Sequence, residues 1–323
     1  MHVLVTGADG FIGRALSRHL AAAGRLRGQA LTRLTLLDRA LGDVPAAPFV
    51  QPMPCDLADT AGLAAWLQAQ QASSPVHAVF HLASIPGGAA EQDPLLARRV
   101  NLDASTTLLE AARAQVLAGG PAPVFIFASS IAVLGTLAAP VDDDTPPRPV
   151  LSYGAHKLVT EILLADSHRR GWVQGLALRL PGVLARPPAR TGQLSAFLSD
   201  FVRELAAGRP FTCPTGPQAT TWASSLPCVV QALVHAAELP SAIGPTRHAL
   251  TLPTLHFTMA ELATAIGQAF GTPAHRLVQW APDARIEALF GRFPPLRTPA
   301  AEAAGFAHDG SLVTLVQRAL VDG

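Results

Sequence analysis

Gly7-Ala8-Asp9-Gly10-Phe11-Ile12-Gly13 is the stretch that decides the fold, because an apolar run precedes it and an amphipathic run begins at Phe11. Glycines spaced by three at a strand-to-helix junction let the chain turn tightly and let backbone N–H groups approach a pyrophosphate. Gly7 permits the turn, Gly10 leaves room for the phosphates, and Gly13 lets the helix and strand pack closely. The pattern predicts a dinucleotide-binding β-α-β unit.

Outward from this turn, short branched-apolar runs alternate with amphipathic stretches, which predicts an α/β fold with a doubly wound parallel sheet, an NAD(P)-binding Rossmann fold. After Pro181 the regularity is lost, and prolines and glycines crowd the chain. We expect an NAD-binding domain at 1–180 with segments returning near 220–254, and a smaller, discontinuous substrate-binding region at 181–219 and 255–323. The expected strands are 2–6, 34–38, 76–82, 124–129, 176–180 and 248–252, and the expected helices are 11–23, 95–117, 152–170, 196–207 and 227–238.

Composition excludes several classes of function. The 323 residues carry a formal net charge of +1, and no basic cluster with interleaved aromatic residues occurs, so nucleic acid is not an expected partner. No apolar run approaches the roughly 20 residues that a membrane helix needs. The cysteines Cys55, Cys213 and Cys228 are scattered without metal-ligand spacing, which favours a reducing, cytoplasmic location and no metal.

Asp38 is the candidate for choosing the cofactor, because it ends the second expected strand. It lies 25 residues after Gly13, beyond the usual spacing of about 20, and the basic insert at 25–33 accounts for the difference. A carboxylate at this place accepts hydrogen bonds from the ribose hydroxyls and repels the extra phosphate of NADP. NAD is therefore the expected cofactor, although the neighbouring Arg39 is a cation that tolerates a phosphate.

Tyr153 and Lys157 are four residues apart on an expected helix, so their side chains project from one face. A free phenol titrates near pH 10, and its use as a base near neutrality requires stabilisation of the phenolate by roughly 4 kcal/mol. A nearby ammonium supplies part of that stabilisation. The spacing alone is common on helices, but Tyr153 is the only tyrosine of the chain, which favours a chemical role.

Ser129 and Ser130 place hydroxyl groups just past the end of a sheet strand, where doubly wound folds bind ligands. Such a hydroxyl can hold a reacting oxygen, and it can equally cap the backbone at the strand end.

Together, the glycine turn, Ser130, and Tyr153 with Lys157 resemble the extended short-chain dehydrogenase/reductase family over essentially the whole chain. The resemblance implies that Ser130, rather than Ser129, is catalytic with Tyr153 and Lys157. It also implies that residues 81–84 line the cofactor, that Asn101 is the family's helix asparagine, and that Asp56 and Leu57 contact adenine. The full set of expected cofactor contacts is Gly7, Gly10, Phe11, Ile12, Gly13, Asp38, Asp56, Leu57, Leu82, Ala83, Ser84, Asn101, Tyr153, Lys157 and Pro181.

The resemblance further implies NAD-dependent oxidation of a 2-hydroxy sugar acid. Arg186 and Arg190 are candidates for binding its carboxylate, because a guanidinium offers paired donors in a planar fork, but each can also be a surface arginine. Trp222 is a candidate pocket wall, with a packed core role as the alternative. Ser84, Ser130 and Tyr153 complete the expected substrate contacts. Leu134 and Leu226 depart from the family pattern, which has an aromatic residue and an arginine at those places.

Other functions share this constellation. A nucleotide-sugar epimerase, a uronate or threonine dehydrogenase, and an NAD-sensing regulatory protein without catalysis all fit the same fold. A dehydratase is less compatible, because Ile131 and Ala132 stand where related dehydratases carry an acidic pair. The helices near 101–117 and 152–170 have apolar residues on both sides, and the resemblance implies that two copies pair through them into a homodimer.

Overall fold

The computed structural model describes residues 1–137, 140–186, 196–240 and 247–321. The chain forms two compact units, and it passes between them several times, so neither unit is a continuous segment. Unit 1 consists of Met1–Val133, Pro149–Arg179 and Val230–Leu250, and unit 2 of Leu134–Arg148, Leu180–Val229 and Thr251–Gly323.

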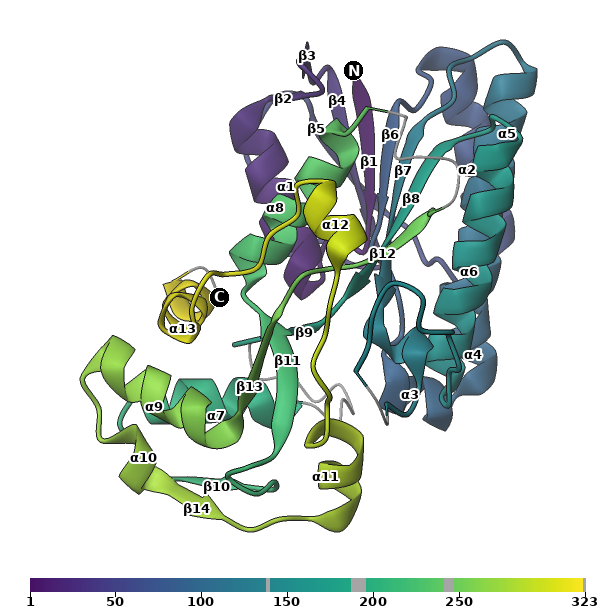
Figure 1. The fold of residues 1–323 in the computed structure, drawn as a ribbon. Coiled ribbons are helices and arrows are strands. Elements are labelled where there is room, and N and C mark those ends of the chain that lie inside the picture. Colours follow the sequence, from purple (N-terminus) through teal and green to yellow (C-terminus); the bar gives the residue numbers. More distant parts are fainter. Residues whose placement is uncertain (138–139, 187–195, 241–246, 322–323) are drawn as a thin grey trace. The chain divides into compact units, whose positions relative to one another are not determined.

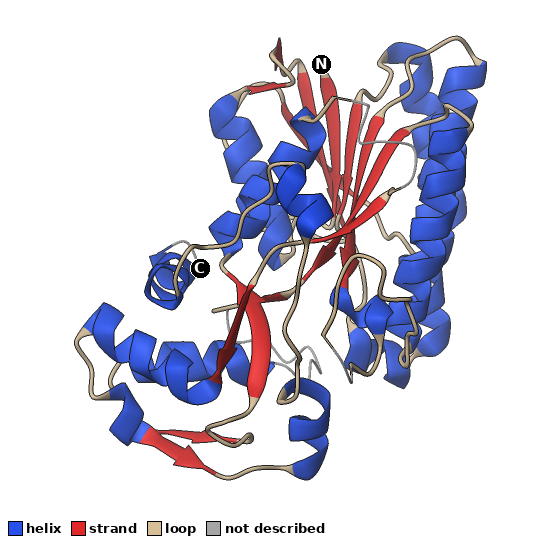
Figure 2. Ribbon diagram, viewed as in Figure 1, coloured by secondary structure: helices blue, strands red, loops and turns tan. Residues whose placement is uncertain are grey.

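A seven-stranded sheet forms the centre of unit 1, with the strand order β12-β8-β7-β6-β1-β4-β5 (Figures 1 and 2). Strands β7, β6, β1, β4 and β5 pair in parallel. The chain first moves outward from β1 to β4 and β5 and then continues on the other side of β1, so the order reverses between β1 and β6. In doubly wound sheets ligands bind at such a reversal. The strands are β1 (His2–Thr6), β4 (Arg33–Asp38), β5 (Val50–Pro54), β6 (Ala78–His81), β7 (Val124–Ser130), β8 (Gln174–Leu180) and β12 (Ala249–Thr251).

Burial of the strands follows their place in the sheet. All five residues of β1 are buried, as expected of a parallel strand covered on both faces. The outer strand β5 is more exposed and contains Pro52 and Pro54, which a sheet tolerates only at its edge. The predicted α/β fold with a doubly wound sheet is confirmed.

Helices cover both faces of this sheet: α1 and α8 lie on one side, and α2, α5 and α6 lie on the other (Figure 1). The second group packs over a core that includes Leu63, Leu108, Phe125, Phe127 and Leu164. The helices are α1 (Phe11–Ala23), α2 (Thr60–Ser73), α3 (Gly87–Gln92), α4 (Pro94–Arg98), α5 (Ala104–Leu117), α6 (Ser152–Arg169) and α8 (Leu226–Glu238), of which α8 begins in unit 2.

Two local irregularities separate the structure from the sequence-based prediction. The helix expected at 95–117 is divided by a π-helical turn at Arg99–Asp103. The basic insert after α1 forms a hairpin of β2 (Arg25–Leu26) and β3 (Gln29–Ala30). Arg27 and Gly28 at its tip both have positive φ, 51° and 70°, which is the backbone of a tight two-residue hairpin turn.

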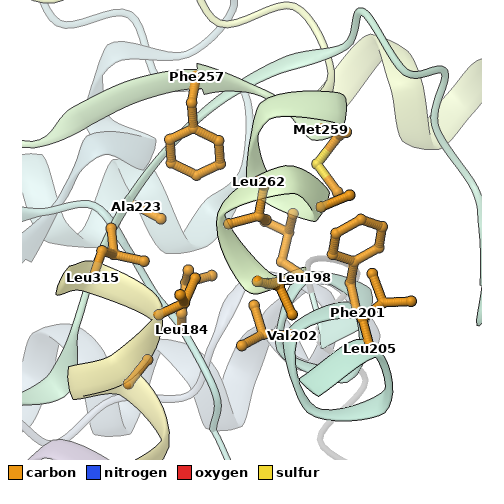
Figure 3. Close-up of a cluster of buried hydrophobic side chains, with 14 of the residues drawn as sticks. Leu184, Leu198, Phe201, Val202, Leu205, Ala223, Phe257, Met259, Leu262 and Leu315 are labelled. Atoms are coloured by element: carbon orange, nitrogen blue, oxygen red, sulfur yellow. The ribbon is translucent and has the colours of Figure 1, made fainter. Parts of the chain in front are cut away.

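Unit 2 has its own hydrophobic core, formed mainly by α7, α9 and α13 (Figure 3). Phe201, Leu205 and Leu262 are fully buried in it, and α9 begins with a capping box between Thr258 and Glu261. Two small sheets, β13-β11-β9 and β10-β14, belong to this unit. Its elements are β9 (Gly182–Val183), α7 (Ala196–Ala206), β10 (Phe211–Cys213), β11 (Thr220–Ser224), β13 (Leu255–Thr258), α9 (Met259–Phe270), α10 (Ala274–Leu277), β14 (Val278–Trp280), α11 (Ala284–Phe290), α12 (Pro299–Ala303) and α13 (Leu312–Val321).

In the part of the chain that the structure describes, no helix combines the length and the apolar character needed to cross a membrane.

Candidate active site

The glycine turn joins the carboxyl end of β1 to the start of α1. Gly7 has a φ of +70°, and a Cβ atom built there would lie 2.7 Å from the Ala83 backbone nitrogen. At Gly13 a Cβ atom would lie 2.0 Å from the Gly7 carbonyl oxygen, closer than any side chain can approach. The predicted reasons for glycine at these two positions are therefore confirmed: one permits the turn, and the other permits close packing of helix on strand.

Asp38 ends β4 and is bound to the same turn. Its Oδ2 accepts a hydrogen bond from the Asp9 backbone N–H at 3.0 Å, and its Oδ1 accepts one from the Arg39 N–H at 2.8 Å. The Asp9 carboxylate in turn pairs with Arg14 and accepts from the Gly42 N–H. These contacts fix the Asp38 carboxylate beside the phosphate turn, and each of its oxygens retains a lone pair for a ribose hydroxyl.

Behind the turn, His81 at the end of β6 is fully buried between two hydroxyl groups. Its Nδ1 lies 2.6 Å from Thr6 Oγ1, and its Nε2 lies 2.7 Å from Ser105 Oγ. Because Ser105 Oγ donates to the Asn101 carbonyl at 2.8 Å, it accepts from Nε2, and Thr6 donates to Nδ1. Burial, together with the Lys157 charge, lowers the pKa of His81 from 6.5 to about 3, so the ring is neutral.

Asn101 lies within the π-helical turn and is almost completely buried. Its Oδ1 accepts a hydrogen bond from the Ile85 N–H at 2.7 Å, and its Nδ2 donates to the Ile85 carbonyl at 3.0 Å. The side chain therefore holds the segment after β6, which carries the expected cofactor contacts Leu82, Ala83 and Ser84. π-turns in helices are frequent at functional sites.

Tyr153 and Lys157 lie on the first turns of α6, as predicted, one helical turn apart. Gly154 brings this part of α6 against the turn that follows β7: a Cβ atom at Gly154 would lie 2.4 Å from the Ala132 carbonyl oxygen. Glu91 of α3 accepts a hydrogen bond from the Ser152 N–H at 2.7 Å and so binds the N-terminus of α6. The tyrosine is thereby held beside the end of β7, where Ser130 lies.

Lys157 is 2% exposed, and it is the only lysine in the chain. Its Nζ donates to the Ala128 carbonyl at 2.7 Å and lies 4.6 Å from the centre of the Phe127 ring and 5.5 Å from that of Tyr153. Burial lowers the pKa of Lys157 from 10.5 to about 7, against the opposing influence of the Glu161 charge. With a pKa of about 7, the Lys157 ammonium is near the midpoint of its titration at neutral pH, next to the phenol.

The structure distinguishes the two serines at the end of β7. Ser129 is buried, and its hydroxyl donates to Glu161 at 2.5 Å. Ser130 is partly exposed, and its oxygen accepts a hydrogen bond from the Ala132 N–H at 3.1 Å. That contact caps the following turn and uses a lone pair, which leaves the hydroxyl proton of Ser130 for a ligand. Of the two residues, Ser130 is the one able to meet a substrate.

Several predicted residues have other surroundings. Leu57 is a core residue, and the Asp56 carboxylate accepts from the Ala58 N–H. Trp222 is 1% exposed within unit 2, and its Nε1 donates to the Pro294 carbonyl at 2.8 Å. The structure thus favours the packed role of Trp222 that the sequence left open, rather than contact with substrate.

Of the remaining predicted contacts, Phe11 and Ile12 begin α1 in unit 1, and Pro181 and Arg186 lie in unit 2. Pro181 is buried, and the Arg186 backbone N–H donates to Ser199 Oγ at 3.2 Å. Arg190 lies outside the described residues.

The side chains that hold these groups were not predicted from the sequence. Thr6 and Ser105 bind His81, Glu91 binds the start of α6, and Glu161 binds Ser129. The one signal for Glu161 was its place four residues after Lys157, which puts both on the same face of α6. Nothing in the sequence marks the other three.

The groups of unit 1 fit a bound dinucleotide. A Cβ atom at Gly10 would meet only the Gly7 carbonyl, at 3.1 Å, so this position stays open for phosphate oxygens. The carboxylate of Asp38 lies at the end of the adjacent strand, beside the same turn. Among the described residues no group of three or more histidine, cysteine, aspartate or glutamate side chains is placed to hold a metal ion.

A Rossmann sheet with a phosphate turn after β1 and a tyrosine–lysine pair beside a strand-end serine defines a class of NAD-dependent oxidoreductases. Residues 3–247 match the NAD dependent epimerase/dehydratase family. The chain belongs to this family, as the resemblance of its motifs predicted.

Individual relatives match nearly the full length. D-erythronate dehydrogenase from Cupriavidus necator is 38% identical over 100% of this chain and 98% of its own. D-erythronate dehydrogenase from Haemophilus influenzae is 30% identical over 98% of both chains. Among solved structures, the nucleoside-diphosphate-sugar epimerase from Agrobacterium tumefaciens is 30% identical, with a TM-score of 0.89 over 98% of this chain and 92% of the other.

Proposed function

We propose that the protein is an NAD-dependent dehydrogenase that oxidises D-erythronate at C2, giving 2-oxo-D-erythronate. The observation that carries the proposal is the pairing of Tyr153 with the buried ammonium of Lys157 on α6, in a chain whose full-length relatives include two D-erythronate dehydrogenases. Five stretches of the sequence carry the resemblance to those enzymes: 3–14, 31–38, 129–135, 152–164 and 175–187.

In the proposed reaction Tyr153, as phenolate, accepts the proton of the C2 hydroxyl at its Oη. The Lys157 ammonium stabilises the phenolate by its charge, and the Ser130 hydroxyl orients the reacting oxygen. Bound NAD supplies the ring that accepts the hydride from C2. Placing the proton acceptor and the orienting donor on two rigid elements, α6 and β7, keeps the substrate oxygen between them.

We further assign residues to the binding of the cofactor and of the substrate. The glycine turn, Asp38, residues 82–84, Asn101 and Lys157 bind NAD, with Asp56, Leu57 and Pro181 as further contacts. The substrate carboxylate is assigned to Arg186 and Arg190, because a guanidinium binds a carboxylate with two parallel hydrogen bonds. Arg186→Lys keeps the positive charge but removes the paired donors of the guanidinium. We expect this variant to have a higher KM for D-erythronate and an unchanged KM for NAD.

The assay mixes enzyme, NAD and D-erythronate and follows NADH absorbance. We expect NADH to accumulate, and Tyr153→Phe to lower kcat/KM by a factor on the order of 10² to 10⁴, the usual contribution of a general base. Full turnover by Tyr153→Phe would remove the tyrosine from the mechanism.

A second candidate is a nucleotide-sugar epimerase, favoured by the similarity to the Agrobacterium structure. An epimerase returns the hydride, so it interconverts sugars without net NADH. A screen of sugar acids and nucleotide sugars separates the two functions: interconversion of a nucleotide sugar, with no NADH from any sugar acid, decides for the epimerase.

We also propose a homodimer and a cytoplasmic location. The support for the dimer is a set of exposed apolar side chains on neighbouring helices of unit 1: Leu95 on α4, Leu117 on α5, and Val159 and Ile162 on α6. We expect light scattering to give the mass of two chains for the wild type and of one chain for Ile162→Glu; a monomeric wild type contradicts the dimer. The support for the location is that Cys55, Cys213 and Cys228 are all free thiols.

A further inference from the structure

A buried group of three polar side chains lies next to Lys157 and takes no part in the proposed proton transfer. Ser129 Oγ donates to Glu161 Oε1 at 2.5 Å. Arg179 binds the same carboxylate through two nitrogens, with Nη2 at 2.8 Å from Oε2 and Nε at 3.0 Å from Oε1. The side chains of Arg179 and Glu161 are only 12% and 5% exposed, so this ion pair is shielded from water and salt.

The group joins the same two elements that hold Lys157. Glu161 is one helical turn after Lys157 on α6, and Ser129 directly follows Ala128, whose carbonyl accepts the Lys157 hydrogen bond. The lysine and the carboxylate thus contact consecutive residues of β7. Arg179 lies on β8, so the group connects three elements: α6, β7 and β8.

We propose that Glu161 is a positioning residue that sets the charge of Lys157. Ser129 holds the Glu161 carboxylate, and Arg179 limits the electric field of that carboxylate. The inference rests on the proposed function, because only there does the charge of Lys157 matter for the phenol of Tyr153. The direction of the electrostatic effect agrees with the geometry, since the Glu161 charge opposes the effect of burial on the Lys157 pKa.

The physical basis is that the two charges of the Glu161–Arg179 pair act on Lys157 with opposite signs. Glu161→Gln leaves the Arg179 cation without its anion, and a second buried cation nearby becomes less favourable. Arg179→Gln leaves the carboxylate unopposed and favours the Lys157 ammonium. The double variant removes both charges, so its field at Lys157 lies between those of the two single variants.

The composition of the chain makes the measurement direct. Lys157 is the only lysine, so protein labelled with ¹³C-lysine gives a single Cε signal whose pH titration reports this one ammonium. In cofactor-free protein we expect a midpoint near 7 for the wild type. Glu161→Gln is expected to weaken proton binding about tenfold. Arg179→Gln is expected to strengthen it, and the double variant to lie between the two single variants.

A purely structural role for the pair predicts a different pattern. Loss of packing would move both single variants in one direction and the double variant furthest, and that result overturns the proposal. An unchanged midpoint in both single variants overturns it as well. The control is Asp166→Asn with Arg170→Gln, an exposed ion pair at the C-terminal end of α6, which should leave the Lys157 midpoint unchanged. Should Arg179→Gln fail to fold, Arg179→Met replaces it, because it removes the same charge and is expected to strengthen proton binding in the same way.

The enzyme assay then connects the charge to turnover. A neutral Lys157 leaves the Tyr153 phenol harder to ionise, so Glu161→Gln is expected to move the acid limb of the kcat/KM profile to higher pH and to regain activity there. A pH-independent loss contradicts the proposed role. The two proposals fail separately: absence of NADH from every sugar acid removes the dehydrogenase, whereas the lysine titration needs neither substrate nor cofactor.

Discussion

Replacement of Lys157 by methionine is expected to make the cofactor-free protein more stable while abolishing its activity. The lysine is buried, and its pKa falls from 10.5 to about 7. At about 1.4 kcal/mol per pH unit, this lowering of the pKa corresponds to a destabilisation of the folded protein by about 5 kcal/mol when the lysine is fully protonated in the unfolded chain and in the folded chain. At pH 7 the destabilisation is about 4 kcal/mol. Methionine removes that penalty and has a similar length.

Part of the gain is offset by contacts that the lysine makes. Its hydrogen bond to the Ala128 carbonyl and its position over the Phe127 ring together stabilise the fold by about 2 kcal/mol. We therefore expect Lys157→Met to raise the free energy of unfolding at pH 7 by about 2 kcal/mol. Lys157→Arg is the matched contrast, because a guanidinium keeps its charge and is expected to destabilise.

The pH dependence identifies the cause. Between pH 7 and 10.5 the unfolded chain binds a proton at this position that the folded chain has lost, so wild-type stability rises with pH across this interval. The advantage of Lys157→Met should shrink accordingly. Urea unfolding of both proteins at pH 7 and pH 9 tests this, and a variant that is less stable than the wild type, or an advantage independent of pH, refutes the reasoning.

Three further predictions concern the cofactor site. Gly13→Ala puts a Cβ atom 2.0 Å from the Gly7 carbonyl oxygen, and we expect titration calorimetry to show no NAD binding. The control is Gly24→Ala, where φ is +61° and a Cβ atom would meet no atom within 4 Å. This variant should lower the free energy of unfolding by about 1 kcal/mol and leave NAD binding intact. Asp38→Asn is expected to raise the ratio of kcat/KM with NADP to kcat/KM with NAD about tenfold, which is equivalent to about 1.4 kcal/mol. An unchanged ratio would mean that residues other than Asp38 determine the choice of cofactor. The His81 pKa is lowered to about 3, so below about pH 6.5 the unfolded chain binds a proton at this histidine and the folded chain does not. The free energy of unfolding should therefore fall from pH 6.5 toward pH 3. Urea titrations should show that His81→Gln reduces this slope by up to about 1.4 kcal/mol per pH unit.

The elements that the sequence predicted best are those whose pattern is determined by local physics. Strand β1 and helix α1 have the expected bounds, because a continuous apolar run, a glycine turn and an amphipathic stretch follow one another directly. Strand β5 was missed, since Pro52 and Pro54 argue against a strand until its place at the sheet edge is known. The π-turn at Asn101 was also missed, because one extra residue in a helix leaves the apolar pattern nearly unchanged.

The candidate site divides in the same way. Gly7, Gly13, Tyr153 and Lys157 are recognisable because backbone geometry or helical spacing demands particular residue types at particular intervals. The side chains that hold them come from distant parts of the chain, such as Glu91, 61 residues before Ser152. A contact of that kind depends on tertiary packing, which no local pattern encodes. The serine pair is intermediate: the sequence placed both hydroxyls at the strand end, and only burial separates Ser129 from Ser130.

Composition supports the assignment of Lys157 in a way that spacing alone does not. The chain has 24 lysine and arginine residues, and arginine occupies every such position but this one. On a solvated surface either residue serves, so the near absence of lysine indicates that arginine is accepted wherever only a charge is required. At position 157 the side chain is buried, contacts one carbonyl group and two aromatic rings, and has a pKa of about 7, close to neutral pH. A guanidinium is larger than an ammonium and does not lose its charge near neutral pH. The position therefore requires the small, titratable cation that a neighbouring phenol needs, and the only tyrosine of the chain is four residues away.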